Sequence, residues 1–585
     1  MSKSVYFNGE NITIPGAYSN IDTTAMTGKS GSQAKIIAII GESDGGEPSA
    51  VQFFTSPSAA RRVLKGGELL KAMEKAWNPV SGSKEGVSLN GASTIACIRT
   101  NAGTKSTYTF KNGNNDVCTV ESKDWGSHTN YQLKLDESDT SRCVDLVVYD
   151  QANDYYETFA GLGDLFTIKY TGTAAYAVLS ITKSNGVLTL QTKTGADADS
   201  ATADISLTLD PKLFKSIPAL INELSAYENY TVTAGNFNGR LSVTDIDPIA
   251  ATSIATGDGQ ALRVTAVLAD MANKLKVSSN LVQVKTSNNA YTLQDTDGAY
   301  VAMTGGTAGA TPSSWATLFD KLSNFDIFYI VPLTSDASIH AELLTHIEEM
   351  SGNIGKERRG IVGGAINESV TDVIQRSREL SSARMQVVYG GFYDIDNATK
   401  QSTLYPPYML AAQHAGRAAG LDDGEPATHD VYRMSAPEFQ LERDDIAQLI
   451  DGGVLAFEYV LGRTSSESAY TRLVWDLTTD TTHDDSVHVE RATGALADSI
   501  NREIREALDA MLTGKRAGNT DVTSAKNRVI SILQERQRKE HIVAFKGVTV
   551  EKEGTVTTVD YNVAPSEPNN FTLITAHFYS EPISL

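Results

Sequence analysis

The chain has 585 residues, of which 41% are hydrophobic and 21% charged; this is the composition of a globular protein with several buried cores, and it excludes a largely disordered chain. Its 50 basic and 71 acidic residues give a formal net charge of −21, which opposes binding to nucleic acid and to anionic membrane surfaces. The cysteines Cys97, Cys118 and Cys143 have neither the spacing of a zinc site nor the even number of a disulfide framework, so we expect reduced thiols.

Residues 1–33 are rich in Ser, Thr, Asn and Gly. Isolated apolar residues such as Ile12 and Ile14 precede the turn-forming pair Pro15-Gly16, a pattern that predicts an extended arm. The segment lacks the basic start and apolar block of a signal peptide, and no apolar run in the chain reaches membrane-spanning length. We therefore expect synthesis and folding in a cytoplasm.

Residues 34–100 predict a first α/β unit. An apolar run at residues 35–40 indicates a buried strand, and Ser56 before Pro57 indicates the capped start of a helix. Gly66-Gly67 interrupts this helix, and residues 94–98 indicate a closing strand.

Residues 101–310 differ in composition and pattern, with short alternating apolar runs between Thr, Ser, Asn, Asp and Gly. These runs predict a β-rich insertion of one or more domains, with a short helix near residues 211–227. The glycine-rich residues 305–309 predict a flexible linker at its end.

Residues 311–465 predict an α/β core. Thr311-Pro312 indicates a helix start, and the apolar residues 325–331 indicate a strand buried on both faces. Further elements then alternate regularly, which predicts a mostly parallel sheet. They are a helix at 337–350, a strand at 360–362, a helix at 370–380 and a strand at 385–389.

Residues 466–585 predict a C-terminal domain with two helices followed by strands. The first helix carries apolar residues every four positions from Leu496 to Leu512, and the second runs over residues 522–539. Alternating apolar residues predict strands at 542–550, 555–563 and 571–579. The predicted fold class is therefore a multidomain α/β and α+β protein.

Several stretches of the chain resemble contractile phage tail sheath proteins, most closely those of large phages of Gram-positive bacteria. The longest begins KIIAIIGESDGG, and others include YPPYMLAAQHAGRAAGLDDG and IDGGVLAFEYV. The segment Ile14-Pro15-Gly16-Ala17-Tyr18 resembles the Pro-Gly-Val-Tyr that opens many sheaths, with Ala17 in place of valine. The matching stretches are residues 14–18, 35–77, 325–369, 405–424, 450–460 and 490–516.

The resemblance implies an inner sheath α/β domain, built from the N-terminal part and the C-terminal third, with β-rich inserted outer domains. It implies homohexameric rings stacked helically around the tail tube protein, and contraction that drives the tube through the host envelope. Baseplate and tail terminator proteins are the other implied partners. The implied product is a virion protein assembled in the host cytoplasm, with no enzymatic activity, catalytic residue, metal or cofactor.

The resemblance also implies that both ends of the chain add strands to sheets of neighbouring subunits. The sequence patterns at the two ends fit this, since an exposed strand edge recruits other chains. The alternative is that both ends pair within their own chain. The candidate strand residues are Ile12, Ile14, Tyr18, Phe571, Leu573, Ile574 and Phe578.

The last predicted helix is basic within an otherwise acidic chain, which suggests a contact with an acidic tube surface. The alternative is that its cations simply complement the helix dipole at the C-terminal end. The candidate tube-contact residues are Lys526, Arg528, Arg536, Arg538 and Lys539.

Two glycine-containing patterns favour enzymatic chemistry only weakly. Gly41-Glu42-Ser43-Asp44-Gly45 matches a nucleophile elbow, but the next helix signal comes only at Ser56. Gly28-Lys29-Ser30 resembles the end of a phosphate-binding loop without the preceding strand.

The histidine patterns are also better explained without metal. The group His483, Asp484, Asp485, His488 and Glu490 lies where acidic residues cap a helix. His340 and His346 are six residues apart, which is not the spacing of a zinc pair on one helix face. A sheath subunit is the preferred hypothesis, with a baseplate or tail-tube-associated structural protein second and an α/β-hydrolase-like enzyme third.

Overall fold

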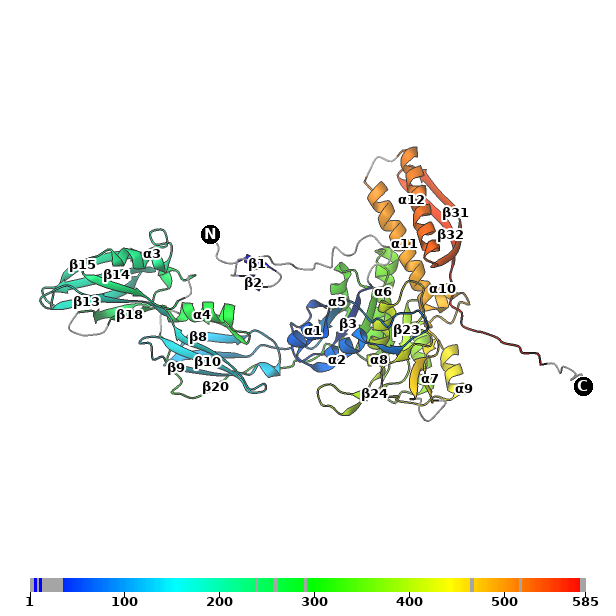
Figure 1. The fold of residues 1–585 in the computed structure, drawn as a ribbon, viewed down its shortest axis with the longest axis horizontal. Coiled ribbons are helices and arrows are strands. Elements are labelled where there is room, and N and C mark those ends of the chain that lie inside the picture. The colour runs from blue at the N-terminus through cyan, green and yellow to red at the C-terminus, as the bar shows by residue number, and fades with distance from the viewer. Residues whose placement is uncertain are drawn as a thin grey trace, which may run out of the picture.

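The computed structural model describes residues 5–7, 10–12, 35–237, 240–255, 261–288, 292–462, 468–514 and 518–578. The molecule is elongated, with an α/β body, a C-terminal pair of long helices beside it, and the β-rich insertion at the far end (Figure 1). No helix in the described ranges is long and apolar enough to cross a membrane.

The body is built on a seven-stranded sheet that is parallel except for β4 at one edge. Strand β3 lies inside it and pairs with β21 on one side and β6 on the other, so residues far apart in the chain meet here. Its residues 37–40 are fully buried, as expected for a strand covered on both faces. In sheet order the strands are β28 (Val454–Leu455), β23 (Met385–Val388), β22 (Arg359–Gly363), β21 (Tyr329–Pro332), β3 (Ile37–Gly41), β6 (Ile95–Arg99) and β4 (Val51–Phe54).

Alternate residues of β3 enter two different cores because successive side chains point to opposite faces of a strand. Ile37 and Ile39 pack with α1 (Pro57–Leu64), α2 (Gly67–Trp77) and α8 (Pro407–Gly420). Ala38 and Ile40 pack on the other face. The helices there are α5 (Ala316–Lys321), α6 (Ala337–Glu348), α7 (Val370–Leu380) and α9 (Arg443–Asp451).

Two small sheets extend the body. One contains β24 (Phe392–Ile395), β25 (Ser402–Tyr405) and β27 (Ala436–Pro437). The other contains β5 (Val80–Gly82), β26 (Val431–Tyr432), β29 (Phe457–Val460) and β30 (Tyr470–Leu473). Short 3-10 turns lie at Ser127–Thr129, Val243–Asp245 and Leu322–Asn324, and a π turn lies at Glu349–Asn353.

The insertion contains two separate apolar cores. The core nearer the body lies between two sheets and α4 (Val267–Ser278). Its strands are β7 (Thr107–Asn112), β8 (Asn115–Ser122), β9 (Gln132–Glu137), β10 (Val144–Asp150), β11 (Tyr155–Leu162), β19 (Val282–Ser287) and β20 (Val301–Ala302).

The second core of the insertion also lies between two sheets, with α3 (Ile217–Ser225) beside them. This unit lies at the far end of the molecule from the C-terminal helices (Figure 1). Its strands are β12 (Asp164–Tyr170), β13 (Tyr176–Ser184), β14 (Val187–Gly195), β15 (Thr202–Leu209), β16 (Tyr230–Ala234), β17 (Ile249–Ser253) and β18 (Leu262–Thr265).

Buried polar side chains fix the joint between body and insertion. The Arg99 guanidinium donates to the carbonyls of Gly46 at 2.9 Å, Trp125 at 3.1 Å and Ala308 at 3.1 Å. The backbone of Thr104 also forms an antiparallel bridge with Thr307. The prediction of a flexible linker at residues 305–309 is therefore wrong, because the outgoing and returning segments hydrogen-bond to each other.

The C-terminal unit consists of α10 (Ser486–Val489), α11 (Arg491–Leu512), α12 (Asn519–Arg538) and the hairpin of β31 (Ile542–Glu553) and β32 (Val556–Pro565). Leu496, Ile500 and Ile504 of α11 pack against Val529 and Leu533 of α12. The four-residue apolar spacing therefore marks a buried face of α11, which packs on α12 and the β31–β32 hairpin.

Several predicted boundaries are corrected. Helix α5 begins at Ala316 and not at Thr311-Pro312, because Glu342 of α6 accepts the Trp315 N–H at 2.7 Å and takes the place of a local cap. The strand predicted at 325–331 begins only at Tyr329. The carbonyl of Phe325 accepts a hydrogen bond from the Arg358 guanidinium and is therefore not paired with a neighbouring strand.

A close contact between α2 and α8 makes a first prediction about stability. A Cβ at Gly416 would lie 2.1 Å from the carbonyl oxygen of Ala76, so Gly416→Ala must push the helices apart. We expect a loss of about 1–3 kcal/mol in the free energy of unfolding of the body, measured by calorimetry of the full-length chain. Gly352→Ala is the control, since its Cβ meets nothing within 4 Å; equal effects of both substitutions would refute the packing argument.

Candidate assembly surfaces

The β31–β32 hairpin packs one face on the two long helices and leaves both of its outer edges open. Phe545, Val559 and Tyr561 lie against the core of α11 and α12. The hairpin is a two-stranded sheet, and no third strand of the described residues pairs with it. Open edges carry unpaired N–H and C=O groups, so the hairpin can accept further strands.

Residues 571–578 form no regular structure, although they carry the alternating pattern of a strand. Leu573 is 93% exposed, Ile574 87% and Phe578 97%. The segment leaves the body beside α10 and runs away from it (Figure 1). The predicted strand 571–579 is therefore absent from the isolated chain over its described residues, because nothing there pairs with it.

At the N-terminal end, β1 (Val5–Phe7) pairs with β2 (Glu10–Ile12) in a small local hairpin. Ile12 is the last residue of β2. Ile14 and Tyr18 lie outside the described residues. The hairpin joins no other sheet of the described chain.

The basic residues of α12 divide into two groups. Lys526, Arg528 and Arg538 are exposed, and Lys539 is half-buried beside Glu535 at 3.2 Å. Arg536 is buried, because the helix turns it toward α11 and the body. The prediction that Arg536 contacts the tube is therefore corrected, since its guanidinium is used inside the chain.

Arg536 belongs to a buried charge cluster around Asp423. It donates to the Asp423 carboxylate at 2.7 Å and to Glu503 at 2.9 Å, while Lys35 approaches Asp423 at 3.0 Å. Burial alone would raise the pKa of Asp423, but the cations of Lys35 and Arg536 outweigh it and hold that pKa well below its usual range. The cluster ties the chain just after the N-terminal arm to the loop after α8 and to both long helices.

Further ion pairs hold α11 to the body along its length. Arg491 binds Asp476 at 2.6 Å in a fully buried pair, and Asp498 accepts from Arg359 at 2.9 Å and Arg384 at 2.8 Å. Farther along the helix, Arg502 and Arg505 bind Glu357 at 3.3 Å and 2.7 Å, so α11 is fixed to the body over more than half of its length.

The nucleophile-elbow pattern lacks the required geometry. Ser43 is buried, and its hydroxyl donates to the carbonyl of Gly45 at 2.7 Å. The chain then enters β4, and α1 begins only at Pro57. Gly28-Lys29-Ser30 lies outside the described residues.

The histidine patterns have structural roles. Asp485 caps the short helix α10 by accepting from the backbone of Val487 and His488, whereas Glu490, at the start of the long helix α11, makes no such capping bond. His340 and His346 are buried in the body, and burial lowers the pKa of each to about 4. Within the described residues, no group of three possible ligands is placed to hold a metal ion.

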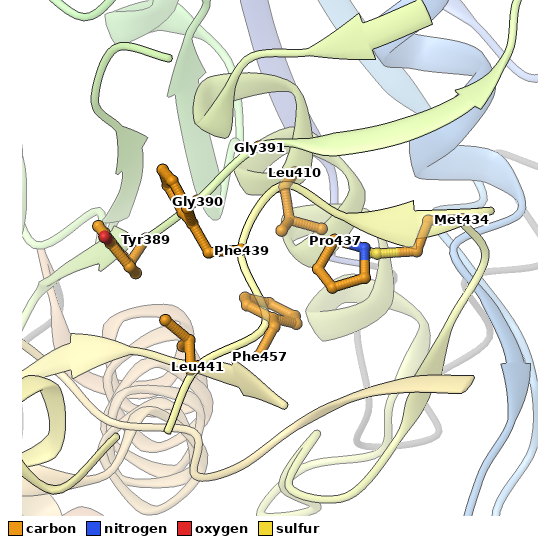
Figure 2. Close-up of a pocket in the computed structure, with 9 residues that line it drawn as sticks. All are labelled: Tyr389, Gly390, Gly391, Leu410, Met434, Pro437, Phe439, Leu441 and Phe457. Carbon is orange, nitrogen blue, oxygen red and sulfur yellow. The ribbon is translucent and has the colours of Figure 1, made fainter. Parts of the chain in front are cut away.

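A pocket lies in the body beyond the carboxyl end of β23 (Figure 2). Its lining residues are mostly apolar, and burial raises the pKa of the Tyr389 hydroxyl. Its lining residues are Tyr389, Gly390, Gly391, Leu410, Met434, Pro437, Phe439, Leu441 and Phe457.

Comparison with known proteins gives close matches along the whole chain. The chain is 30% identical over 579 residues to the tail sheath protein of Bacillus phage SP01, covering 98% of this chain and 97% of that protein. It is 27% identical over 567 residues to the putative tail sheath protein of Enterococcus phage phiEF24C, covering 96% of each.

Among solved structures, the sheath tail protein of Desulfitobacterium hafniense has the same fold. The TM-score is 0.54 at 15% identity, covering 94% of this chain and 97% of that one. No family model matches the chain.

The Asp423 cluster predicts that Arg536 and Arg538 differ sharply in their contribution to stability. Removing one partner of a buried ion pair leaves an uncompensated charge, so Arg536→Ala should lower the opening free energy of α11 and α12 by about 3–5 kcal/mol. Hydrogen exchange of the α12 amides measures this. Arg538→Ala is the matched control and should change it by no more than about 0.5 kcal/mol; equal effects would contradict the assignment.

Proposed function

Because the chain belongs to the tail sheath protein family, and so is a structural component of the contractile tail of the virion, we propose a mode of assembly for it. Many copies polymerise around the tail tube through exchange of terminal strands. The single observation that carries this proposal is the exposed apolar segment from Leu573 to Phe578, which pairs with no strand of the described residues. The C-terminal hairpin likewise has no third strand within the described residues. The near-complete overlap with sheath proteins favours a sheath subunit over a baseplate or tube-associated protein.

In the proposed exchange, residues 571–578 of one copy add a strand to the β31–β32 hairpin of another. A strand of about five residues adds roughly five backbone hydrogen bonds at ~0.5–1.5 kcal/mol each. Burying Leu573, Ile574 and Phe578 adds ~1.5–3 kcal/mol for each side chain. Each link is therefore strong enough to be specific, and it consists of a short segment that can bend while two bodies move.

The N-terminal arm supplies a second link. Ile12, Ile14 and Tyr18 are its candidate contact residues, and the arm reaches the body at Lys35, next to the Asp423 cluster. With a link at each end, every copy both donates and accepts, and copies related by the same operation form a ring or a helix. The proposed form is a stack of hexameric rings.

Contraction in this proposal is a rearrangement of rigid bodies that stay linked by their arms. The extended sheath is then a metastable state separated from the contracted one by a barrier, and no bound nucleotide is needed to drive the change. Contraction drives the tail tube through the host envelope.

A finite stack leaves unused arms at one end and unused hairpin edges at the other. Other proteins must cover them, because exposed edges and apolar arms recruit further copies. Baseplate and tail terminator proteins are the proposed partners at these ends. Assembly of the whole takes place in the host cytoplasm.

Lys526, Arg528 and Arg538 are the proposed contacts to an acidic tube surface, with Lys539 beside them. They are exposed on a helix that lies outside the insertion and its two cores. Exposed ion pairs contribute only about 0–1 kcal/mol each, so such contacts release readily when the sheath moves.

The C-terminal arm gives a direct test. Substituting Leu573, Ile574 and Phe578 together by Ser should leave a folded monomer that no longer forms tubes in electron micrographs, because the added strand loses its buried side chains. Deletion of residues 1–20 should act in the same way at the other end. Leu213→Ser, which changes a 66%-exposed leucine of the insertion, is the control and should assemble normally. Normal tubes from the arm variants would rule out strand exchange.

The tube contact is tested by charge reversal. The double variant Arg528→Glu and Arg538→Glu should bind purified tail tubes more weakly in a co-sedimentation assay, with the wild-type melting temperature. Arg378→Glu, at an exposed position of α7, is the control and should bind as the wild type does. Binding that is unchanged in the double variant would remove α12 from the tube contact.

A further inference from the structure

The C-terminal arm is attached to the body over a short segment, residues 566–571, before it becomes free. We call these residues and their contacts on the body the root. The backbone N–H of Ser566 donates to the carbonyl of His541 at 3.1 Å, which closes the base of the hairpin. The Ser486 hydroxyl of α10 then donates to the Glu567 carboxylate at 2.8 Å. The chain is thus turned from the hairpin toward α10.

Glu490 is the centre of this root. It is 5% exposed, and its carboxylate accepts from the Trp475 indole at 3.2 Å and from the Asn570 side-chain amide. The ring of Phe571 lies edge-on against Trp475 with 5.8 Å between centroids. Two groups of the body therefore hold two consecutive residues of the arm.

The attachment ends abruptly. Asn570 is partly buried, whereas three and four residues later Leu573 is 93% exposed and Ile574 is 87% exposed. The root thus decides where the free arm begins and in which direction it leaves, away from β31 and β32 (Figure 1).

The direction matters because the arm has an open edge close by in its own chain. Residues 566–570 follow β32 directly and have the length of an ordinary β-hairpin loop. Without the root, residues 571–578 are able to fold back as a third strand on their own hairpin. Such pairing within one chain has a high effective concentration and would win over pairing between copies.

We propose that Glu490, with Asn570, Trp475 and Phe571, is a positioning device that keeps the arm off its own hairpin and so directs it to a second copy. This inference rests on the proposed strand exchange. Since the arm is held as far as Phe571, its residues to Phe578 span at most about 25 Å. The accepting edge of the second copy therefore lies within that distance of Phe571 in the copy that donates the arm.

The test compares Glu490→Ala, Glu490→Gln and Asn570→Ala in the full-length chain. In Glu490→Ala and Asn570→Ala, hydrogen exchange of the monomer should show protection of residues 571–578 rising on the order of tenfold, because the arm pairs with its own hairpin. Tube formation should slow correspondingly. Glu490→Gln keeps an acceptor oxygen for Trp475 and Asn570, so it should behave like the wild type.

Asn570→Ala also guards against a folding artefact, because Asn570 lies in the arm and its removal leaves the body intact. An unprotected arm together with normal tube formation in both Glu490→Ala and Asn570→Ala would overturn the inference. Failure of strand exchange itself gives a different result in the tube-formation assay. The serine variant of Leu573, Ile574 and Phe578 would then assemble normally, whatever the effect of the Glu490 and Asn570 substitutions.

Discussion

The Asp423 carboxylate connects the segments that the proposed assembly uses. It lies between Lys35, which begins the body directly after the N-terminal arm, and Arg536, near the end of the helix that leads into β31. A buried carboxylate is stable only when it is paired, so these segments must meet for the chain to fold. The bases of the N-terminal arm and of the accepting hairpin are thereby fixed relative to each other.

The rest of the C-terminal unit follows the same principle. Its helices share an apolar core with each other and with the hairpin, whereas α11 is joined to the body through Arg491, Asp498 and their partners. Charge pairs of this kind demand a definite geometry, and they cost much when one partner is removed. The unit therefore presents its open hairpin edges at a defined place beside the body. The Glu490 root extends this control to the outgoing arm.

Sequence patterns were sufficient where structure is determined locally. The bounds of α7 agree with the helix predicted at 370–380, and alternation predicts the hairpin of β31 and β32. The two strands end three and two residues later than predicted. Helix α4 was missed, because its first N–H groups include Val267, whose acceptor is Asp247, distant in the sequence. The burial of Arg536 is hidden for a similar reason. The basic residues around it in the sequence indicate an exposed helix face, and only the fold brings Asp423 to its guanidinium. The Glu490 root combines residues from four segments, so no local pattern reveals it.

The joint at Arg99 has a mechanical meaning. Its guanidinium binds the body at Gly46, the near part of the insertion at Trp125 and the returning segment at Ala308. The near half of the insertion is thus connected to the body as a stiff bracket and not through a swivel. A modest turn of the body carries the distant end through an arc that grows with its distance from Arg99. In the proposed assembly, with the insertion directed outward, it acts as a lever that converts small rotations near the axis into large displacements at the circumference.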